Sequence, residues 1–205
     1  CLAGAGGTVS NCVVRGNVAD SNTSGGAIYM MTPNGRVTRT LISGNGVQNP
    51  GVGGGVCMLA GCLDNCLVVS NTTSSGTRYP YGGGIHMSGG QVANCTIARN
   101  EGNQGGGLYR KANAGYVVNT ILYGNIEYGT ATIGSPDWVS LYGTTIPTEI
   151  AFSNVCAAVG VGVDPVPTAT FPCNETTYAL ETGSPCIDAG RAIAEAGSLD
   201  LAGGA

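Results

Sequence analysis

The amino-acid sequence predicts an all-β fold of the solenoid class, in which short strands wind into stacked coils. Glycine is abundant, at 36 of 205 residues, while only 10% of the residues are charged. Within each repeated segment apolar residues alternate with other residues, which is typical of β-strands. The segment opens on glycines and closes on asparagine, and the closing positions are 28, 26, 29 and 25 residues apart, at Asn17, Asn45, Asn71, Asn100 and Asn125. A period near 27 residues predicts about five regular coils.

The composition excludes several other classes of protein. Helices tolerate so much glycine poorly, and disordered chains usually carry more charge. The net charge is −4 and the eight Lys and Arg residues are scattered, so we expect no nucleic-acid partner. No apolar run approaches the roughly 18 residues of a membrane span, so we expect none.

Each repeat contains three strand-like pieces. Alternation places every second residue of a piece inside the coil. The first piece follows the glycines and should point Ile28/Met30, Val56/Met58 and Ile85/Met87 inward. The second should bury Val9, Val37, Leu63, Val92 and Val117. The third should bury Cys12, Thr40, Cys66, Cys95 and Thr120, followed by Val14, Ile42, Val68, Ile97 and Leu122.

A bend is expected between the second and third pieces, where four repeats carry asparagine. Stacked asparagines can bond to one another and to the backbone of the bend, which predicts an asparagine ladder. Arg39 interrupts it in the second repeat, which requires that its side chain turn outward or find a partner. The expected ladder residues are Asn11, Asn65, Asn94 and Asn119. The segments after the closing asparagines vary in length, so we interpret them as loops on one face.

We expect one domain in two parts. Residues 1–125 form the regular coils, and residues 126–205 form terminal coils and a less regular, loop-rich cap. Residues 137–142 and 149–156 are interpreted as less regular strands. The chain opens at Cys1, without an initiator Met, so we expect a mature or incomplete chain.

The repeated Gly-Gly-Gly and Asn-Cys-x-Ile-x-x-Asn runs resemble right-handed parallel β-helix proteins of bacterial cell surfaces. Residues 119–125 and 178–190, and the run Asp200-Leu201-Ala202-Gly203, are similar to the choice-of-anchor Q type. This resemblance implies a right-handed parallel β-helix. It also implies a secreted or cell-surface protein of environmental bacteria.

The nine cysteines point to a secreted chain with a few disulfides and some buried thiols. A single histidine and the absence of a paired Cys-x-x-Cys motif argue against a zinc site, so we expect neither a metal nor another cofactor. Cys12, Cys66 and Cys95 should form a buried thiol column. The candidates for disulfides are Cys57 with Cys62 at a tight turn, and Cys156, Cys173 and Cys186 in the loop-rich half.

No residues are assigned to catalysis. The sharpest local cluster is predicted on the outward face of the first strand, at Tyr29, Cys57, His86 and Tyr109. We interpret it as an exposed strand face, with two alternatives: a sugar-binding strip of Tyr29, His86 and Tyr109, or a Cys-His nucleophile that lacks an orienting third group. A glycoside hydrolase needs two positioned carboxylates, and the acidic residues are dispersed.

An apolar stripe is predicted on the outward face of the third strand. Either the C-terminal half folds over this stripe, or it is a lateral or subunit interface. Its candidate interface residues are Val13, Leu41, Leu67 and Ile121.

The leading hypothesis is an extracellular structural or adhesive protein, and enzymatic activity is left open. Unpaired strands at the end of a coil stack invite pairing with another copy, and head-to-tail pairing would produce filaments. The alternatives are a polysaccharide lyase or glycoside hydrolase, and a non-catalytic module that binds extracellular glycans.

Overall fold

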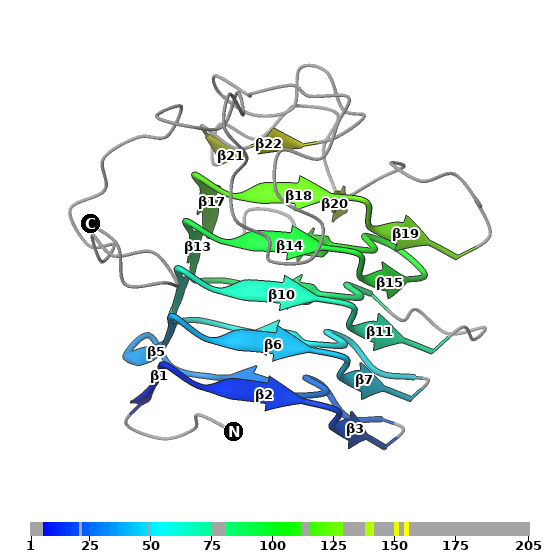
Figure 1. Ribbon diagram of the computed structural model, residues 1–205, viewed down its shortest axis with the longest axis horizontal. Coiled ribbons are helices and arrows are strands. Elements are labelled where there is room, and N and C mark those ends of the chain that lie inside the picture. Colours follow the sequence, from blue (N-terminus) through cyan, green and yellow to red (C-terminus); the bar gives the residue numbers. More distant parts are fainter. Residues whose placement is uncertain are drawn as a thin grey trace.

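The computed structural model describes residues 6–20, 22–48, 50–74, 81–111, 115–128, 138–141, 150–151 and 154–155. Over these residues the chain forms short β-strands that pair in parallel and stack into four sheets. Figure 1 shows the strands lying in layers above one another. The predicted all-β parallel solenoid is therefore confirmed.

The sheets are named here by letter. Sheet A contains β4 (Ile28–Met30), β8 (Val56–Met58), β12 (Ile85–Met87), β16 (Leu108–Lys111) and β20 (Trp138–Leu141). Sheet B contains β1 (Gly7–Ser10), β5 (Gly35–Thr38), β9 (Cys62–Asp64), β13 (Gln91–Ala93), β17 (Tyr116–Val118) and β21 (Ile150–Ala151). Sheet C contains β2 (Val13–Arg15), β6 (Leu41–Ser43), β10 (Leu67–Val69), β14 (Thr96–Ala98), β18 (Ile121–Tyr123) and β22 (Asn154–Val155). Sheet D contains β3 (Val18–Ala19), β7 (Gly46–Val47), β11 (Thr72–Thr73), β15 (Glu101–Gly102) and β19 (Ile126–Glu127).

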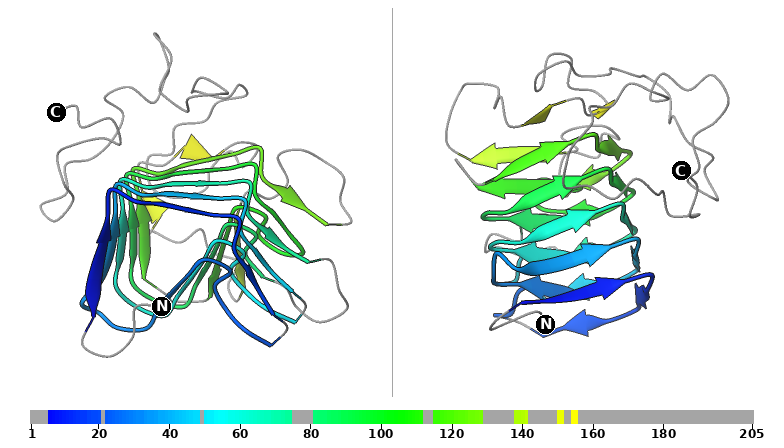
Figure 2. Two further views of the ribbon diagram at one scale, coloured as in Figure 1. Left: turned by 60° about the horizontal axis from the view of Figure 1, so that its bottom comes forward. Right: turned by 90° about the vertical axis from the view of Figure 1, so that its left-hand side faces the viewer.

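Each coil passes through sheets B, C, D and A in turn, so corresponding strands superpose in the left view of Figure 2. The sequence predicted three strand pieces in a coil, and the structure contains a fourth. Sheet D begins directly after each closing asparagine, in segments that were interpreted as loops. Its strands are only two residues long, too short for an alternating pattern to identify them.

Two bends turn the chain, from sheet B to sheet C and from sheet C to sheet D. The first bend holds one residue in the left-handed region, with φ between 46° and 55°, at Asn11, Arg39, Asn65, Asn94 and Asn119. Asparagine enters this region more readily than most residues, which explains why it recurs here. The second bend also holds one residue in the left-handed region, with φ between 54° and 68°, at Gly16, Gly44, Ser70, Arg99 and Gly124.

The glycine runs return the chain from sheet D to sheet A at very close range. A Cβ atom on Gly83 would lie 2.3 Å from the carbonyl oxygen of Glu101 and 2.5 Å from that of Gly106. Gly82, one residue earlier, holds a φ of 68°. The return therefore packs backbone against backbone, and this explains why the sequence repeats glycine there.

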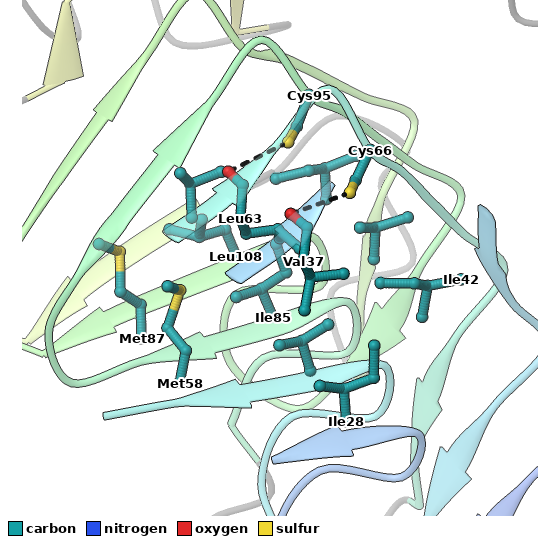
Figure 3. Packing of buried hydrophobic residues seen from close by; sticks show 14 of the residues in the cluster. Ile28, Val37, Ile42, Met58, Leu63, Cys66, Ile85, Met87, Cys95 and Leu108 are labelled. Atoms are coloured by element: carbon teal, nitrogen blue, oxygen red, sulfur yellow. Dashed lines mark hydrogen bonds between the residues drawn. The ribbon is translucent and has the colours of Figure 1, made fainter. Parts of the chain in front are cut away.

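The core fills the inside of the coils as predicted, and Figure 3 shows part of it. Met30, Met58 and Met87 form one column, because β4, β8 and β12 pair in register. Arg110 occupies the next position, where it is only 2% exposed and donates from Nη2 to the carbonyl of Gly115 at 2.7 Å. The other buried columns include Val37, Leu63, Val92 and Val117, and Ile42, Val68, Ile97 and Leu122.

Beyond β19, three further strands continue the stack. β20 pairs with β16, β21 with β17 and β22 with β18. They fall within the two segments that the sequence predicted as less regular strands. Residues 156–205, with the predicted cap, lie outside the described residues. Within the described ranges, no helix has the length and apolar character needed to cross a bilayer.

Candidate functional site

The most regular polar feature of the molecule is a buried ladder of the closing asparagines. Each side chain reaches the next coil: the Nδ2 atoms of Asn17, Asn45, Asn71 and Asn100 donate to the Oδ1 atoms of Asn45, Asn71, Asn100 and Asn125, each at 2.9 Å. The backbone N–H of each donor residue also donates to the same oxygen, for example from Asn71 N to Asn100 Oδ1 at 2.9 Å. The amides are therefore satisfied inside the stack.

These asparagines define the repeat in the sequence, but no bonding role was predicted for them. Their recurrence in every repeat was the available signal. Asn45, Asn71, Asn100 and Asn125 are all buried, which asparagine seldom is without hydrogen-bond partners.

The asparagines predicted to form a ladder lie at the first bend, where the sequence placed them. Asn119 Nδ2 donates to Asn94 Oδ1 at 3.0 Å, so adjacent coils do join there. Asn65 Nδ2 donates to the carboxylate of Asp64 at 3.2 Å. Arg39 finds a partner, as its presence in this column required, because its Nε donates to Asn11 Oδ1 at 3.1 Å. This column therefore combines left-handed backbone conformations with side-chain bonds to different kinds of partner.

The outward cluster on sheet A is brought together as the register predicted. Tyr29, Cys57, His86 and Tyr109 occupy corresponding positions of β4, β8, β12 and β16. The rings of His86 and Tyr109 stack with centroids 5.2 Å apart and planes 10° apart. No stacking contact of Tyr29 is found among the described residues.

Tyr81 completes this cluster and was not predicted from the sequence. It bridges to Gln104 just before the glycines of its coil, and its ring stacks on Tyr109 with centroids 4.3 Å apart. Tyr109 is consequently only 3% exposed. A sugar-binding strip needs ring faces open to solvent, and the faces of Tyr109 are used inside the protein.

Cys57 and His86 approach each other, with Sγ and Nδ1 3.7 Å apart. Burial raises the pKa of the Cys57 thiol to about 12, although a hydrogen bond with Ser24 opposes the shift. Burial, with the positive charge of Lys111, lowers the pKa of His86 to about 4. A nucleophilic Cys-His pair needs a lowered thiol pKa, so both groups are shifted toward their neutral, unreactive forms.

The predicted disulfide between Cys57 and Cys62 is wrong for this structure. Cys57 is a free, buried thiol on β8, while Cys62 begins β9 in sheet B. The turn that separates them directs the two residues to different sheets. Of the predicted thiol column, Cys66 and Cys95 are buried and Cys12, in the first coil, is exposed. Cys156, Cys173 and Cys186 lie outside the described residues.

The described carboxylates are dispersed, as the sequence suggested. Asp64 is buried on sheet B, where its Oδ2 pairs with Arg36 Nη2 at 2.8 Å. Asp20 follows β3, and Glu101 lies in β15, on another sheet from Asp64. In the part of the chain that the structure describes, no three His, Cys, Asp or Glu side chains are grouped to hold a metal ion.

The apolar stripe on sheet C is continuous in register but unevenly exposed. Val13, Leu41, Leu67 and Ile121 occupy one row, together with Thr96. Val13 is 62% exposed, whereas Leu67 is 8% exposed and packs with Leu41, Val69 and Ala98 in a second small cluster. The open part of the stripe is therefore its first coil.

That first coil is also the least covered part of the core. Val9 and Val14 point inward and pack on the core but are only partly buried, whereas the next residues in their columns, Val37 and Ile42, are 0% exposed. The strands β1, β2 and β3 are the outermost members of sheets B, C and D. The face of residues 6–20, called the first-coil face here, thus combines strand edges that pair with no other described strand and accessible apolar side chains.

Comparison of the chain with protein-family models, with curated proteins and with solved structures finds no match.

Proposed function

We propose that this protein is an extracellular structural β-solenoid that associates with further copies of itself through the first-coil face. The observation that carries the proposal is the partial exposure of Val9 and Val14, whose neighbours in the next coil are fully buried. Covering apolar surface releases about 25 cal/mol for each Å². A second copy placed against this face would cover both valines and pair the edges of β1, β2 and β3.

The interior of the described coils supports a structural role. Its polar groups are used to join one coil to the next, as in the ladder through Asn45, Asn71 and Asn100. The cluster of Cys57, His86 and Tyr109 is likewise occupied with internal contacts. These side chains stabilise a rod and are not arranged around a substrate.

Location outside the cell, membership of the choice-of-anchor Q type and a bacterial source belong to the same proposal. They rest on the resemblance of the sequence runs 119–125, 178–190 and 200–203 to that type. The stacked parallel coils agree with the fold that this resemblance implies.

The proposal is tested by measuring molar mass against concentration, with light scattering after gel filtration and with negative-stain electron microscopy. We expect assemblies that grow with concentration. Val14→Lys should weaken them, because it places a charge on the first-coil face, whereas Gln48→Lys, on an exposed residue after β7, should not. Circular dichroism checks that both variants fold. A wild-type protein that stays monomeric at millimolar concentration would contradict the proposal.

A further inference from the structure

A thiol and an imidazole face each other on the outer side of sheet A. Cys57 in β8 and His86 in β12 are register partners on adjacent parallel strands, and Cys57 Sγ lies 3.7 Å from His86 Nδ1. Cys57 is 1% exposed, while His86 is half-buried. A cysteine sulfur and an imidazole nitrogen are the protein atoms that soft metal ions prefer, and here the two meet at a site largely shielded from water.

The neighbouring aromatic rings hold the imidazole in place. The ring of His86 stacks on that of Tyr109, and its centroid lies 6.5 Å from that of Tyr81, with planes 24° apart. These contacts limit rotation of the imidazole, so Nδ1 stays directed at the Cys57 sulfur. In the tautomer that carries its proton on Nε2, Nδ1 presents a lone pair to the thiol. A ligand that is positioned in advance loses little conformational freedom when it binds an ion.

The separation of the two atoms fits a shared metal ion. Bonds of about 2.3 Å to sulfur and about 2.0 Å to nitrogen, as in zinc sites, would span 3.7 Å with an angle of about 120° at the metal. Widening the gap by about 0.6 Å would make the arrangement linear, with the same bond lengths. Rotation of the Cys57 side chain is enough for such a change. Both angular arrangements are therefore accessible without moving β8 or β12.

The charges around the pair select the kind of ion. Among the described residues, no third His, Cys, Asp or Glu side chain completes the group, whereas zinc sites use three or four protein ligands. Lys111 places a positive charge close enough to act on His86. A divalent ion would leave a net positive charge at this buried position, which is costly. A monovalent ion that replaces the thiol proton leaves the charge of the pair unchanged.

We propose that Cys57 Sγ and His86 Nδ1 together bind a monovalent soft cation of the copper(I) and silver(I) class. On binding, the sulfur–hydrogen bond breaks, bonds from the metal to sulfur and to nitrogen form, and one proton leaves to solvent. The oxidation state of the metal does not change. The sequence predicted no metal because it lacks the ligands of a zinc site, but a soft monovalent cation needs only two. The bound ion would join adjacent coils through β8 and β12.

Silver(I) is the probe, because it is stable in air and binds sulfur and nitrogen as copper(I) does. The chain contains one histidine, so NMR of protein labelled with heavy nitrogen gives ring-nitrogen resonances that report on His86 alone. Silver nitrate is added in chloride-free buffer, up to nine equivalents because the chain has nine cysteines. We expect the Nδ1 resonance to move to a new position and saturate. In Cys57→Ser the same shift should need at least about tenfold more silver, because the soft ligand is lost. The matched control is Cys12→Ser, which removes an exposed thiol and should behave as wild type.

Three results would overturn the proposal. The first is an Nδ1 resonance that does not move in wild-type protein. The second is an equal response of Cys57→Ser, which would show that the imidazole binds silver without the sulfur. The third is tighter binding of zinc, added as zinc acetate, since the site would then not select a monovalent ion. Circular dichroism checks that each variant folds, and Cys57→Ala takes the place of Cys57→Ser if the serine variant does not.

Discussion

The thiol of Cys66 donates a hydrogen bond to the backbone carbonyl of Asp64, with sulfur and oxygen 3.2 Å apart, across the left-handed residue Asn65. The corresponding residues of the other coils make the same bond. In each, the γ atom of the residue after the bend donates to the backbone carbonyl two positions earlier. It is made by Cys12 at 3.1 Å, Thr40 at 2.9 Å, Cys95 at 3.1 Å and Thr120 at 2.9 Å. The column therefore selects a small side chain with a donor on its γ atom, which explains why cysteine and threonine replace each other.

We expect Thr40→Val to lower the free energy of unfolding by about 1 kcal/mol, the usual net contribution of one hydrogen bond. Valine matches the shape of threonine but cannot donate to the carbonyl of Thr38 or accept from Cys12 N, which lies 3.4 Å from Thr40 Oγ1. Thr40→Cys keeps a γ donor and should lose less. Urea unfolding under reducing conditions measures both, and equal stability of the valine variant and wild type would contradict the role of the bond.

Asn71→Asp should be strongly destabilising at neutral pH. The new carboxylate would face the carbonyl of Ile42 and the oxygen of Asn100, where Asn71 places donors, so about 3 kcal/mol or more should be lost. Burial beside acceptors raises the folded pKa of that carboxyl above its unfolded value. Stability is therefore retained below the unfolded pKa near 4 and lost as the pH rises.

The measurement is the difference in free energy of unfolding between Asn71→Asp and wild type at pH 4 and at pH 7. We expect the difference to be smaller at pH 4. Gln48→Glu introduces the same change from amide to acid at an exposed residue and should cost little at either pH. A pH-independent difference for Asn71→Asp would show that the new carboxyl is not buried against acceptors.

His86 should make the protein less stable in mild acid. Its pKa in the folded protein is lowered to about 4 by burial and by Lys111, against an ordinary value of 6.5. The folded state therefore favours the neutral imidazole. The contribution of the neutral imidazole to the free energy of unfolding is fully present above pH 6.5. It decreases as the pH falls toward 4, by up to about 3 kcal/mol.

Because the sequence contains one histidine, its ring resonances in an NMR titration report this pKa directly. His86→Gln removes the titration and should flatten the dependence of stability on pH between 6.5 and 4, relative to wild type. A folded-state titration midpoint near 6.5 would contradict the burial of this ring against Cys57 and Tyr109.

The described thiols should differ sharply in their rates of alkylation. Cys12 is exposed, whereas Cys57, Cys66 and Cys95 are buried. Burial also raises the pKa of Cys57 and, with the neighbouring Cys66 thiol, that of Cys95, so little reactive thiolate forms. Pulse labelling with iodoacetamide followed by peptide mass spectrometry should find Cys12 modified before Cys57, Cys66 and Cys95. Rapid modification of Cys66 in native protein would contradict the packing of this column.

Several features of this protein could be predicted from its sequence because they depend only on local periodicity. The spacing of the closing asparagines defines the coil, and strand alternation selects Val37, Leu63 and Val92 for the core. The glycine turns that lead into sheet A and the left-handed asparagines at the first bend can also be predicted locally. Both depend on the backbone conformations that a single residue allows.

Only the tertiary structure decided what happens at the bends and on the outer faces. Strand alternation does not extend through a left-handed residue, so the sequence could not determine which asparagine column turns inward. The structure buries Asn71 almost completely in the ladder, at 1% exposed, whereas Asn65 at the first bend keeps 7% of its surface exposed. Likewise, Tyr109 looks exposed by alternation but is covered by Tyr81 from another coil. Such coverage depends on contacts between residues far apart in the chain, and a local repeat carries no information about them.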